Sequence, residues 1–546
     1  MREIDRLTTE RFSTPSLLLM ESAAAASARA IAARFPDGLQ GKRARILCGR
    51  GNNGGDGAAL ARALWLAGAR TDVILFGRVE ETTGDARTNF EMTKRLSSFE
   101  AGSHTQPPPL SFTQCESITD WEEIAAHSYD IIVDALFGTG LTRPLEGVHR
   151  QVVEHVELLR RARERASTGQ PLIVSLDVPS GLNADSATLK GEAVQADLTV
   201  TFTAPKTANV LPPASHYNGE LIVANIGSPP ALLEAAETQT FLIEEGDARE
   251  WLVKTRYAPD SYKNTHGHAL IIAGSRGMTG AAVLCGKAAM RAGAGLVTIA
   301  TPTSAQPAVA ARASSEIMTA TLPETTQGAI SFEAVEQVMK VGRRANVLAI
   351  GPGLSNEDES TRRFVREIIE KRTTPVVIDA DGLNALAPWP ESLRGSEELP
   401  LILTPHPGEM LRLLGKDNSE ALADRVQAAR DFASAHGVIL VLKGTRTLTA
   451  SPDGRVFVNP TGNAGLGTAG AGDTLTGIIT GFIAQAVATL KETMDVLSAT
   501  IAAVYVGGLA GDIAAKQKGM RTLIASDISE SLSAAICALD AEGEQP

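Results

Sequence analysis

The 546-residue sequence contains few cysteines, few aromatic residues and no surplus of positive charge. Its four cysteines, Cys48, Cys115, Cys285 and Cys537, lie far apart and form no CxxC pair, which argues against a disulfide scaffold and a cysteine-ligated zinc site. The 51 Lys and Arg residues are outnumbered by 63 Asp and Glu residues, so the formal net charge is −12. Because general binding to nucleic acid depends on cations that neutralise phosphates, we expect no nucleic-acid partner.

The sequence also lacks a recognisable secretion or membrane segment. The N-terminus MREIDRLTTERF is charged and has no apolar centre, so no secretion signal is expected. No stretch approaches the roughly 20 apolar residues that span a bilayer, and the longest mostly apolar run, 499–510, predicts a buried helix. We therefore expect a cytoplasmic protein without a membrane partner, and the sequence leaves its oligomeric state open, a homo-oligomer among the alternatives.

What the sequence does contain is a repeated unit, a short apolar run that ends in Gly, Asp or Pro. In the first half such runs occupy 44–57, 129–140, 171–181 and 197–206, with helix-like stretches at 58–69 and 149–166. Continuous apolar runs predict strands buried on both faces, and their alternation with helices predicts a doubly wound α/β fold. The alternation stops at 227–240 and restarts with runs at 268–275, 345–354, 375–386, 401–410 and 438–448. Two α/β domains are therefore predicted, at 1–226 and 241–540, joined by a linker at 227–240.

Ligands of open α/β sheets bind at the carboxyl ends of the strands, so polar residues at these ends are the candidate site residues. In the first half they are Asn52, Asn53, Asp56, Asp134 and Asp177, with Lys206 offering a compensating charge; in the second half they are Gly353, Asp379, Asp381, His406, Glu409 and Lys443.

The turn Gly49–Gly54 reads GxGxxG between a strand and a helix, which by itself is a weak indication of a dinucleotide site. The turn continues as NNGGDG, and crowded amide and carboxylate oxygens suit a cation or a polar sugar or amide group better than phosphate alone. The alternative is an Asx-rich turn in which Asp56 caps the following helix.

Four motifs of the first half, GNNGGDG (51–57), VDALFGTG (133–140), LDVPSG (176–181) and FTAPK (202–206), resemble in that order the motifs of the NAD(P)H-hydrate epimerase domain, the YjeF N-terminal family. The resemblance covers about residues 1–225 and implies a Rossmann-like three-layer sandwich. It implies that the hydrated nicotinamide nucleotide is bound by Asn52, Asn53, Gly54, Gly55, Asp56, Gly138, Thr139, Gly140, Leu141, Thr142, Arg143, Pro144 and Asp177. It also implies a potassium ion at Asn53, Asp134 and Ser180. Because a buried carboxylate is suited to acid–base work, we take Asp177, against the nicotinamide ring, as the catalytic residue.

The second half contains the segment Asn463–Asp473, in which three of the six residues before Asp473 are glycines and an apolar helical stretch follows. Glycines before a helix leave backbone N–H groups free to bind an anion, to which the helix dipole adds. A carboxylate at Asp473, beside a bound phosphate, is unfavourable unless it accepts a proton or meets a metal; the alternative is a plain N-cap. No GxxxxGK[ST] motif exists in the chain, so this is not a Walker A loop.

GAGD (470–473) resembles the ribokinase-like superfamily, in which the aspartate activates a substrate hydroxyl. Together with GSRGMTGAA (274–282), AMRAGAGLV (289–297), GPGL (351–354), DADGLNAL (379–386), TPHPGEM (404–410) and KGTRT (443–447), it resembles the NAD(P)H-hydrate dehydratase domain over about residues 240–535. This implies a ribokinase-like three-layer α/β domain in which Ala281, Gly353, His406, Pro407, Gly408, Glu409 and catalytic Asp473 contact the hydrated nucleotide. It implies that ADP, with magnesium, is bound by Lys443, Gly444, Thr445, Arg446, Thr447, Asn463, Ala464, Gly465, Leu466, Gly467, Thr468, Ala469, Gly470, Ala471 and Gly472.

The two resemblances together imply an enzyme that interconverts the R and S forms of hydrated NADH and NADPH and dehydrates the S form at the expense of ADP. ADP rather than ATP follows from the fused two-domain relatives and from no residue of this sequence. A competing interpretation makes the C-terminal half a kinase of a small, vitamin-type molecule and the N-terminal half a non-catalytic nucleotide-binding module. The preference between NADH and NADPH stays open.

Overall fold

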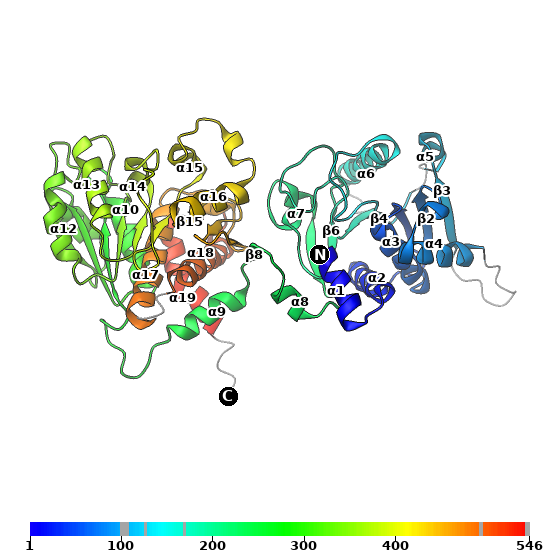
Figure 1. The fold of residues 1–546 in the computed structure, drawn as a ribbon, viewed down its shortest axis with the longest axis horizontal. Coiled ribbons are helices and arrows are strands. Elements are labelled where there is room, and N and C mark those ends of the chain that lie inside the picture. The colour runs from blue at the N-terminus through cyan, green and yellow to red at the C-terminus, as the bar shows by residue number, and fades with distance from the viewer. Residues whose placement is uncertain (99–108, 125–127, 167–170, 491–494, 541–546) are drawn as a thin grey trace. The chain divides into compact units, whose positions relative to one another are not determined.

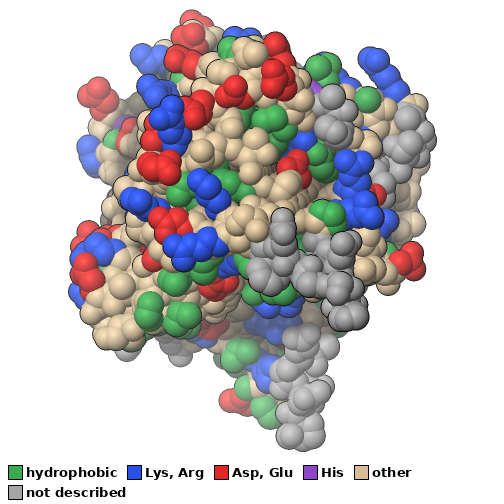
Figure 2. All heavy atoms as spheres, turned by 90° about the vertical axis from the view of Figure 1, so that its right-hand side faces the viewer, with side chains coloured by type: hydrophobic (Ala, Val, Ile, Leu, Met, Phe, Trp, Pro, Cys, Tyr) green, Lys and Arg blue, Asp and Glu red, His purple; other side chains and the backbone are tan. Residues whose placement is uncertain are grey.

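In the computed structural model the chain folds into two α/β units, residues 1–237 and 238–546, and each unit has its own sheet (Figure 1). The structure describes residues 1–98, 109–124, 128–166, 171–490 and 495–540. The predicted two-domain α/β architecture is thereby confirmed. On the face seen in Figure 2, Lys and Arg side chains are interspersed with Asp and Glu side chains.

The N-terminal unit is built on a seven-stranded parallel sheet with the order β3-β2-β1-β4-β5-β6-β7. Its strands are β1 (Arg43–Cys48), β2 (Arg70–Phe76), β3 (Leu110–Cys115), β4 (Ile131–Ala135), β5 (Leu172–Leu176), β6 (Leu198–Phe202) and β7 (Glu220–Ala224). The strand order reverses between β1 and β4, whose following loops therefore leave in opposite directions and open a crevice at the carboxyl edge of the sheet.

Helices cover both faces of this sheet. They are α1 (Arg2–Phe12), α2 (Ser16–Ala32), α3 (Asn52–Leu66), α4 (Gly84–Ser97), α5 (Ile118–Ile124), α6 (Gly147–Ala166), α7 (Thr207–Val210) and α8 (Pro230–Glu234). Ile46 of β1 shares a core cluster with α2, α3 and α4, whereas its neighbour Leu47 shares one with Trp121 of α5 and Val153 of α6. Successive residues of one strand thus face different helix layers, which makes the unit a three-layer sandwich.

The C-terminal unit contains a ten-stranded sheet with the order β11-β10-β9-β12-β13-β14-β15-β16-β17-β8. The strands are β8 (Thr240–Leu242), β9 (His268–Ile272), β10 (Leu296–Pro302), β11 (Met318–Leu322), β12 (Val347–Ile350), β13 (Val376–Ile378), β14 (Leu401–Leu403), β15 (Ile439–Leu442), β16 (Leu448–Ala450) and β17 (Val456–Val458). The pairs from β11 to β15 are parallel, β16 and β17 follow as an antiparallel meander, and β8 pairs in parallel with β17. Thr240, the last residue of the predicted linker, is therefore already part of this sheet.

The helices of this unit are α9 (Glu245–Lys254), α10 (Thr279–Arg291), α11 (Gln306–Arg312), α12 (Val335–Gly342), α13 (Glu359–Glu370), α14 (Ala380–Ala385), α15 (Pro407–Leu413), α16 (Arg425–His436), α17 (Ala471–Leu490), α18 (Val496–Lys518) and α19 (Ala525–Asp540). Ile271 of β9 shares a core cluster with α9, α10, α17, α18 and α19. Its neighbours Leu270 and Ile272 are fully buried but lie outside that cluster, so the opposite face of the sheet is covered as well.

Two helices, α17 and α18, are long and apolar enough to cross a membrane by length and composition alone. This corrects the expectation that no stretch of the sequence reaches that length. Within their most apolar windows, 67% of α17 and 72% of α18 is buried inside the unit, as in the core helices of a globular domain. The run 499–510 lies in α18, so the prediction of a buried helix there is confirmed.

Candidate active sites

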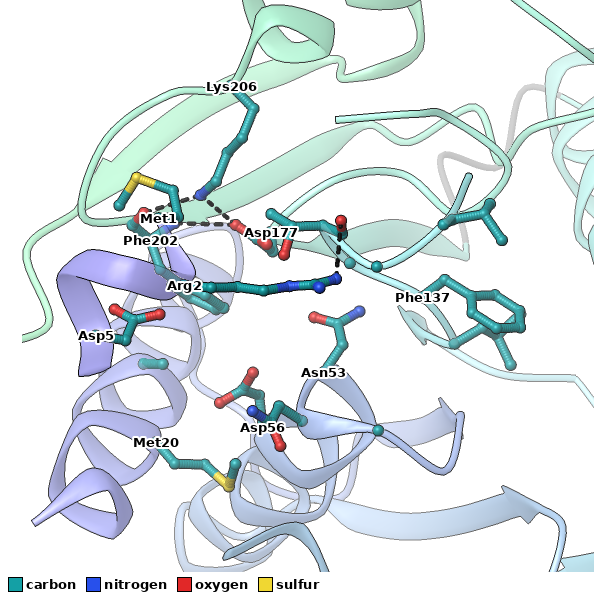
Figure 3. A pocket seen from close by; sticks show the side chains of 18 of the residues that line it. Met1, Arg2, Asp5, Met20, Asn53, Asp56, Phe137, Asp177, Phe202 and Lys206 are labelled. Atoms are coloured by element: carbon teal, nitrogen blue, oxygen red, sulfur yellow. Dashed lines mark hydrogen bonds and ion pairs between the residues drawn. The ribbon is translucent and has the colours of Figure 1, made fainter. Parts of the chain in front are cut away.

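A cavity of about 650 Å³ opens at the crevice between β1 and β4 of the N-terminal unit (Figure 3). The predicted residues that line it are Asn52, Asn53, Asp56, Gly138, Thr139, Gly140, Leu141, Arg143, Pro144 and Asp177. Gly54 and Gly55 are buried behind it: a Cβ atom added to Gly54 would lie 1.8 Å from the Gly49 carbonyl oxygen, so Gly54 permits close packing of the helix on the loop. Thr142 is not among the lining residues.

The segment expected as an Asn-rich turn is in fact the first turn of α3, which begins at Asn52 with Gly51 as its N-cap. Asp56 is therefore the fifth residue of the helix and not its cap, which corrects the alternative given above. The start of the helix lines the cavity, and its N-terminal dipole favours a negatively charged group there.

Asp177 follows β5 in a left-handed backbone conformation (φ 66°), which is strained for a residue other than glycine. Its N–H donates to the Val200 carbonyl at 2.7 Å, and its Oδ1 atom accepts from the Lys206 ammonium in a buried ion pair. Lys206 also donates at 2.9 Å to both Thr201 Oγ1 and the Phe202 carbonyl. The second carboxylate oxygen, Oδ2, lies 3.2 Å from the position of a Cβ built on Gly138 and so faces the cavity.

Asp134 and Ser180 lie together beneath the cavity. The Ser180 N–H donates to Asp134 Oδ2 at 2.8 Å and its hydroxyl contacts Asp134 Oδ1 at 2.5 Å. Burial raises the pKa of Asp134, against the effect of these hydrogen bonds. Ser180 Oγ also accepts from Phe137 N–H at 2.9 Å, and the next residue, Gly138, lies against Asn53. Both polar atoms of the Asn53 amide are buried without a hydrogen-bond partner among the described residues.

Asp5 and Asp56 add two further carboxyl groups to the cavity, and in Figure 3 both lie on the side opposite the Asp177–Lys206 pair. Burial, and then the charges of Asp177 and Asp5, raise the pKa of Asp56 well above its ordinary value. Burial likewise raises the pKa of Asp5. The cavity therefore combines an ion-paired carboxylate with carboxyl groups that retain a proton to higher pH.

Sequence reasoning missed the part of the wall that α1 and α2 supply, together with His149. The missed lining residues include Met1, Arg2, Asp5, Ser16, Leu19, Met20 and His149. The Arg2 guanidinium reaches across from α1 and donates to the Thr139 carbonyl at 3.3 Å. No motif marks α1, and Ile4 and Thr8 are its only buried residues, so the sequence carried little signal for it.

In the C-terminal unit the predicted anion-binding segment is open to solvent: every residue from Asn463 to Asp473 is at least partly exposed. The Asn463 side chain fixes its start by accepting from Gly465 N–H at 2.9 Å and donating to Asp512 at 2.8 Å. α17 then begins at Ala471, and Asp473 lies in its first turn as predicted. The N–H groups of Gly472 and Asp473 have no hydrogen-bond partner among the described residues, as an anion site requires.

Lys443 connects the carboxylates around this turn. Its ammonium donates to Asp379 at 2.8 Å and lies 3.7 Å from Glu409, while Thr476 donates to the other Asp379 oxygen at 2.7 Å. Burial alone would lower the pKa of Lys443, but the carboxylates of Asp379 and Glu409 raise it. Burial, with the nearby charge of Asp379, raises the pKa of Asp473 to about 6.

Of the remaining predicted residues, Gly353 follows β12 and His406 follows β14, whereas Ala281 lies in α10. His406 caps α15. Its ring nitrogen Nδ1 accepts from Gly408 N–H at 3.0 Å, and its backbone N–H donates to the Glu409 carboxylate at 2.8 Å. A Cβ built on Gly353 (φ 62°) would lie 3.0 Å from the Ala281 side chain, so these two residues are adjacent. In the segment 443–447, the carbonyl of Thr445 accepts a hydrogen bond from the Arg425 guanidinium at 2.9 Å. No motif had indicated this contact.

Comparison with known proteins finds one matching family for each of the two units. The family described as YjeF-related protein N-terminus matches residues 16–208, and the family described as NAD(P)H-hydrate dehydratase matches residues 269–534. A bifunctional NAD(P)H-hydrate repair enzyme of Moorella thermoacetica is 39% identical over 544 residues, covering 100% of this chain and 97% of the relative. Its counterpart in Thermofilum pendens is 36% identical, covering 98% of this chain and 95% of the relative. Among solved structures, the ADP/ATP-dependent NAD(P)H-hydrate dehydratase of Bacillus subtilis, co-crystallized with ATP/Mg²⁺, is 32% identical with a TM-score of 0.47, covering 56% of this chain and 100% of that one.

Proposed function

Because the chain belongs to the family of bifunctional NAD(P)H-hydrate repair enzymes, we propose how its residues divide the two reactions. The N-terminal cavity interconverts the R and S forms of hydrated NADH and NADPH, and the C-terminal site returns the S form to the intact dinucleotide at the expense of ADP. The observation that carries this division is that each unit has its own carboxylate, Asp177 or Asp473, beside groups suited to hold a nucleotide.

In the epimerase half, Asn52–Asp56 and Gly138–Pro144 hold the hydrated nucleotide and Asp177 faces its nicotinamide ring. Configuration at the hydrated carbon inverts only when a bond there breaks and reforms, so a neighbouring group must take up a proton and return it. Lys206 donates a hydrogen bond to Oδ1 of Asp177, and Oδ2 stays directed at the cavity. This arrangement supports Asp177 as the group that takes up and returns the proton. The strained backbone at Asp177 also points to a functional constraint on its position.

Potassium is proposed at Asn53, Asp134 and Ser180, where it would offset negative charge and orient oxygen ligands. The buried Asn53 amide, which has no hydrogen-bond partner in the described part of the chain and lies beside a loop that contacts the Ser180 hydroxyl, supplies the kind of oxygen such a cation needs. We expect the epimerase rate to fall severalfold when potassium is replaced by a large organic cation and to recover on adding it back. An epimerase rate indifferent to the cation would rule this site out.

In the dehydratase half, the N–H groups at the start of α17, which no described residue accepts from, hold the phosphates of ADP together with the 463–472 segment and Lys443–Thr447. Three carboxylates around Lys443 leave this region negative, so a divalent cation is needed to admit a polyphosphate. Magnesium, which binds through one or two carboxylates plus substrate phosphates, fits this donor set, and it would neutralise charge on the phosphates.

Asp473 is proposed to take the proton of the substrate hydroxyl while the hydroxyl oxygen receives the terminal phosphoryl group of ADP. Hydroxide is a poor leaving group, since water has a pKa of about 15.7, whereas a phosphate ester eliminates readily. Loss of phosphate together with a ring proton then restores the dihydronicotinamide. Ala281, Gly353 and the His406–Glu409 segment would hold the ring within reach of Asp473.

The test is one reaction: the purified protein is incubated with both epimers of hydrated NADH, ADP and magnesium, and the return of dihydronicotinamide absorbance is recorded. Complete recovery is expected. Asp473→Ala should abolish recovery, and Asp177→Asn should stop it once the S form is used up. Accumulation of a stable phosphate ester would instead support a small-molecule kinase, an alternative that the full-length relatives do not favour.

We place the chain in the cytoplasm, since all four of its cysteines are free thiols and three of them are buried.

A further inference from the structure

A second cavity, of about 670 Å³, opens on the C-terminal unit next to the candidate hydrate site. Three segments line it: the loop after β12, the end of α14 and the end of α15. The lining residues are Asn356, Asn384, Ala387, Pro388, Arg412, Gly415, Lys416 and Asp417. No motif identified in the sequence assigns a role to Arg412, Lys416 or Asp417.

Two of the segments that line this cavity also carry residues of the candidate hydrate site. Gly353 precedes Asn356 in the same loop, and His406 and Glu409 precede Arg412 on α15. Arg412 Nε donates to Asn384 Oδ1 at 2.9 Å, which ties α15 to α14. The candidate hydrate residues and part of the lining of the second cavity therefore belong to the same two segments of the chain.

The Arg412 guanidinium faces the hydrate site. A Cβ built on Gly408 would lie 2.9 Å from Cε1 of His406 and 4.0 Å from Nη1 of Arg412. The imidazole and the guanidinium thus border the same space above Gly408, which the missing side chain leaves free. No described residue accepts a hydrogen bond from the two terminal nitrogens of Arg412, so they are available to a ligand.

Lys416 is directed to the cavity by the way α15 ends. Gly415 adopts the left-handed conformation (φ 62°), and the N–H of Lys416 returns to the Leu411 carbonyl at 2.9 Å, as in a Schellman motif. Two cations, Arg412 and Lys416, face a single carboxylate, Asp417. In a chain of net charge −12, such a cavity is suited to a phosphate-bearing ligand.

We propose that this second cavity binds the adenylate half of the hydrated dinucleotide, with Arg412 and Lys416 against its phosphates. The inference rests on the proposed dehydratase function and extends it to substrate recognition. Arg412 lies six positions after His406, a rise of about 9 Å along a helix, which suits a diphosphate that follows a nicotinamide riboside. Asn356 and Asn384 offer amide groups to the ribose or adenine.

The experiment compares two substrates, hydrated NADH and hydrated reduced nicotinamide riboside, which lacks both phosphates and the adenosine. Steady-state dehydration of both is measured with the full chain and with Arg412→Gln, Lys416→Gln and the control Arg455→Gln, an exposed arginine in the β16–β17 turn. Losing a charged hydrogen bond should raise the KM for hydrated NADH about tenfold in Arg412→Gln and severalfold in Lys416→Gln. The KM for the riboside should change less than twofold in every variant.

Equal increases for both substrates would overturn the proposal, because Arg412 would then act by positioning His406. Unchanged KM values in Lys416→Gln, a substitution outside the helix that leaves folding least affected, would overturn it as well. Failure of the wild-type protein to dehydrate either substrate would instead refute the proposed function itself, so the two failures are distinguishable.

Discussion

At the scale of single residues, Asp177 and Lys206 show how a strand-end carboxylate becomes a site residue. The aspartate was expected from its place after an apolar run, and its pairing with Lys206 was anticipated only as a compensating charge. The pair is buried, with 12% of the Asp177 side chain and 6% of the Lys206 side chain exposed. Which strand ends meet depends on the strand order, which no local pattern encodes.

Lys206→Met should destabilise the N-terminal unit by about 3–5 kcal/mol, because it leaves the Asp177 charge buried without a partner. Denaturant unfolding of the N-terminal unit measures the loss, and epimerase activity should fall with it. Lys190→Met, at an exposed lysine, is the matched control and should change stability by less than about 0.5 kcal/mol. If both variants unfold at the same denaturant concentration, the ion pair does not stabilise the unit. The double variant with Asp177→Asn should regain part of the loss.

Asp473 should make the dehydratase reaction depend on pH. Its pKa is raised to about 6, and only the carboxylate can accept the substrate proton, so kcat/KM should rise as pH increases through about 6 and level off above 7. Initial rates between pH 5 and 8 measure this profile. Asp473→Glu should move the midpoint; a midpoint unmoved by that substitution would assign the titration to another group, such as ADP itself.

At the scale of elements, buried strands could be predicted well. The run 171–181 contains β5 and the run 438–448 contains β15, because a strand covered on both faces has no polar side to interrupt it. The three-residue strands β8, β16 and β17 are too short to leave a pattern. α1 was missed for a related reason: its contribution to the cavity is polar, and polar residues at a chain terminus resemble solvated ones.

The start of α17 carries a prediction of its own. In Gly472→Ala the new Cβ would lie 3.4 Å from Lys443 Nζ, in the space proposed for phosphate, so the KM for ADP should rise roughly tenfold. Stability should hold or improve, since alanine favours a helix over glycine by up to about 1 kcal/mol. Gly246→Ala, also at the second position of a helix but with nothing within 4 Å of its Cβ, is the control. A KM for ADP that is unchanged in Gly472→Ala would place the phosphates elsewhere.

At the scale of the whole molecule, the chain consists of two units with separate cores. Among the residues that the structure describes, three buried clusters lie between Leu19 and Ile226, and a large one lies between Ile243 and Leu539. Pairing an epimerase with a stereospecific dehydratase lets a mixture of damaged epimers be repaired completely, which neither reaction achieves alone.

Residues 1–237 and 238–546, produced separately, should each fold and keep their own activity, because each range forms a compact unit with a sheet of its own. Circular dichroism checks folding, and the epimerase and dehydratase assays check function. Mixed at equal concentration, the two pieces should consume both epimers to completion. An N-terminal piece that folds but leaves the R form unchanged would favour the non-catalytic interpretation of that half.

The strand β8 sets the first residue from which a separately produced C-terminal unit can begin and still keep its whole sheet. A polypeptide trimmed to residues 269–534, the span of the family match, would lose the pairing of β8 with β17 and the stacking of Phe241 on Phe457. It would also lose α9, whose Trp251 is fully buried against Phe482. An uncovered β17 is a template for intermolecular strand pairing, so the shorter polypeptide should precipitate where the one starting at 238 stays in solution.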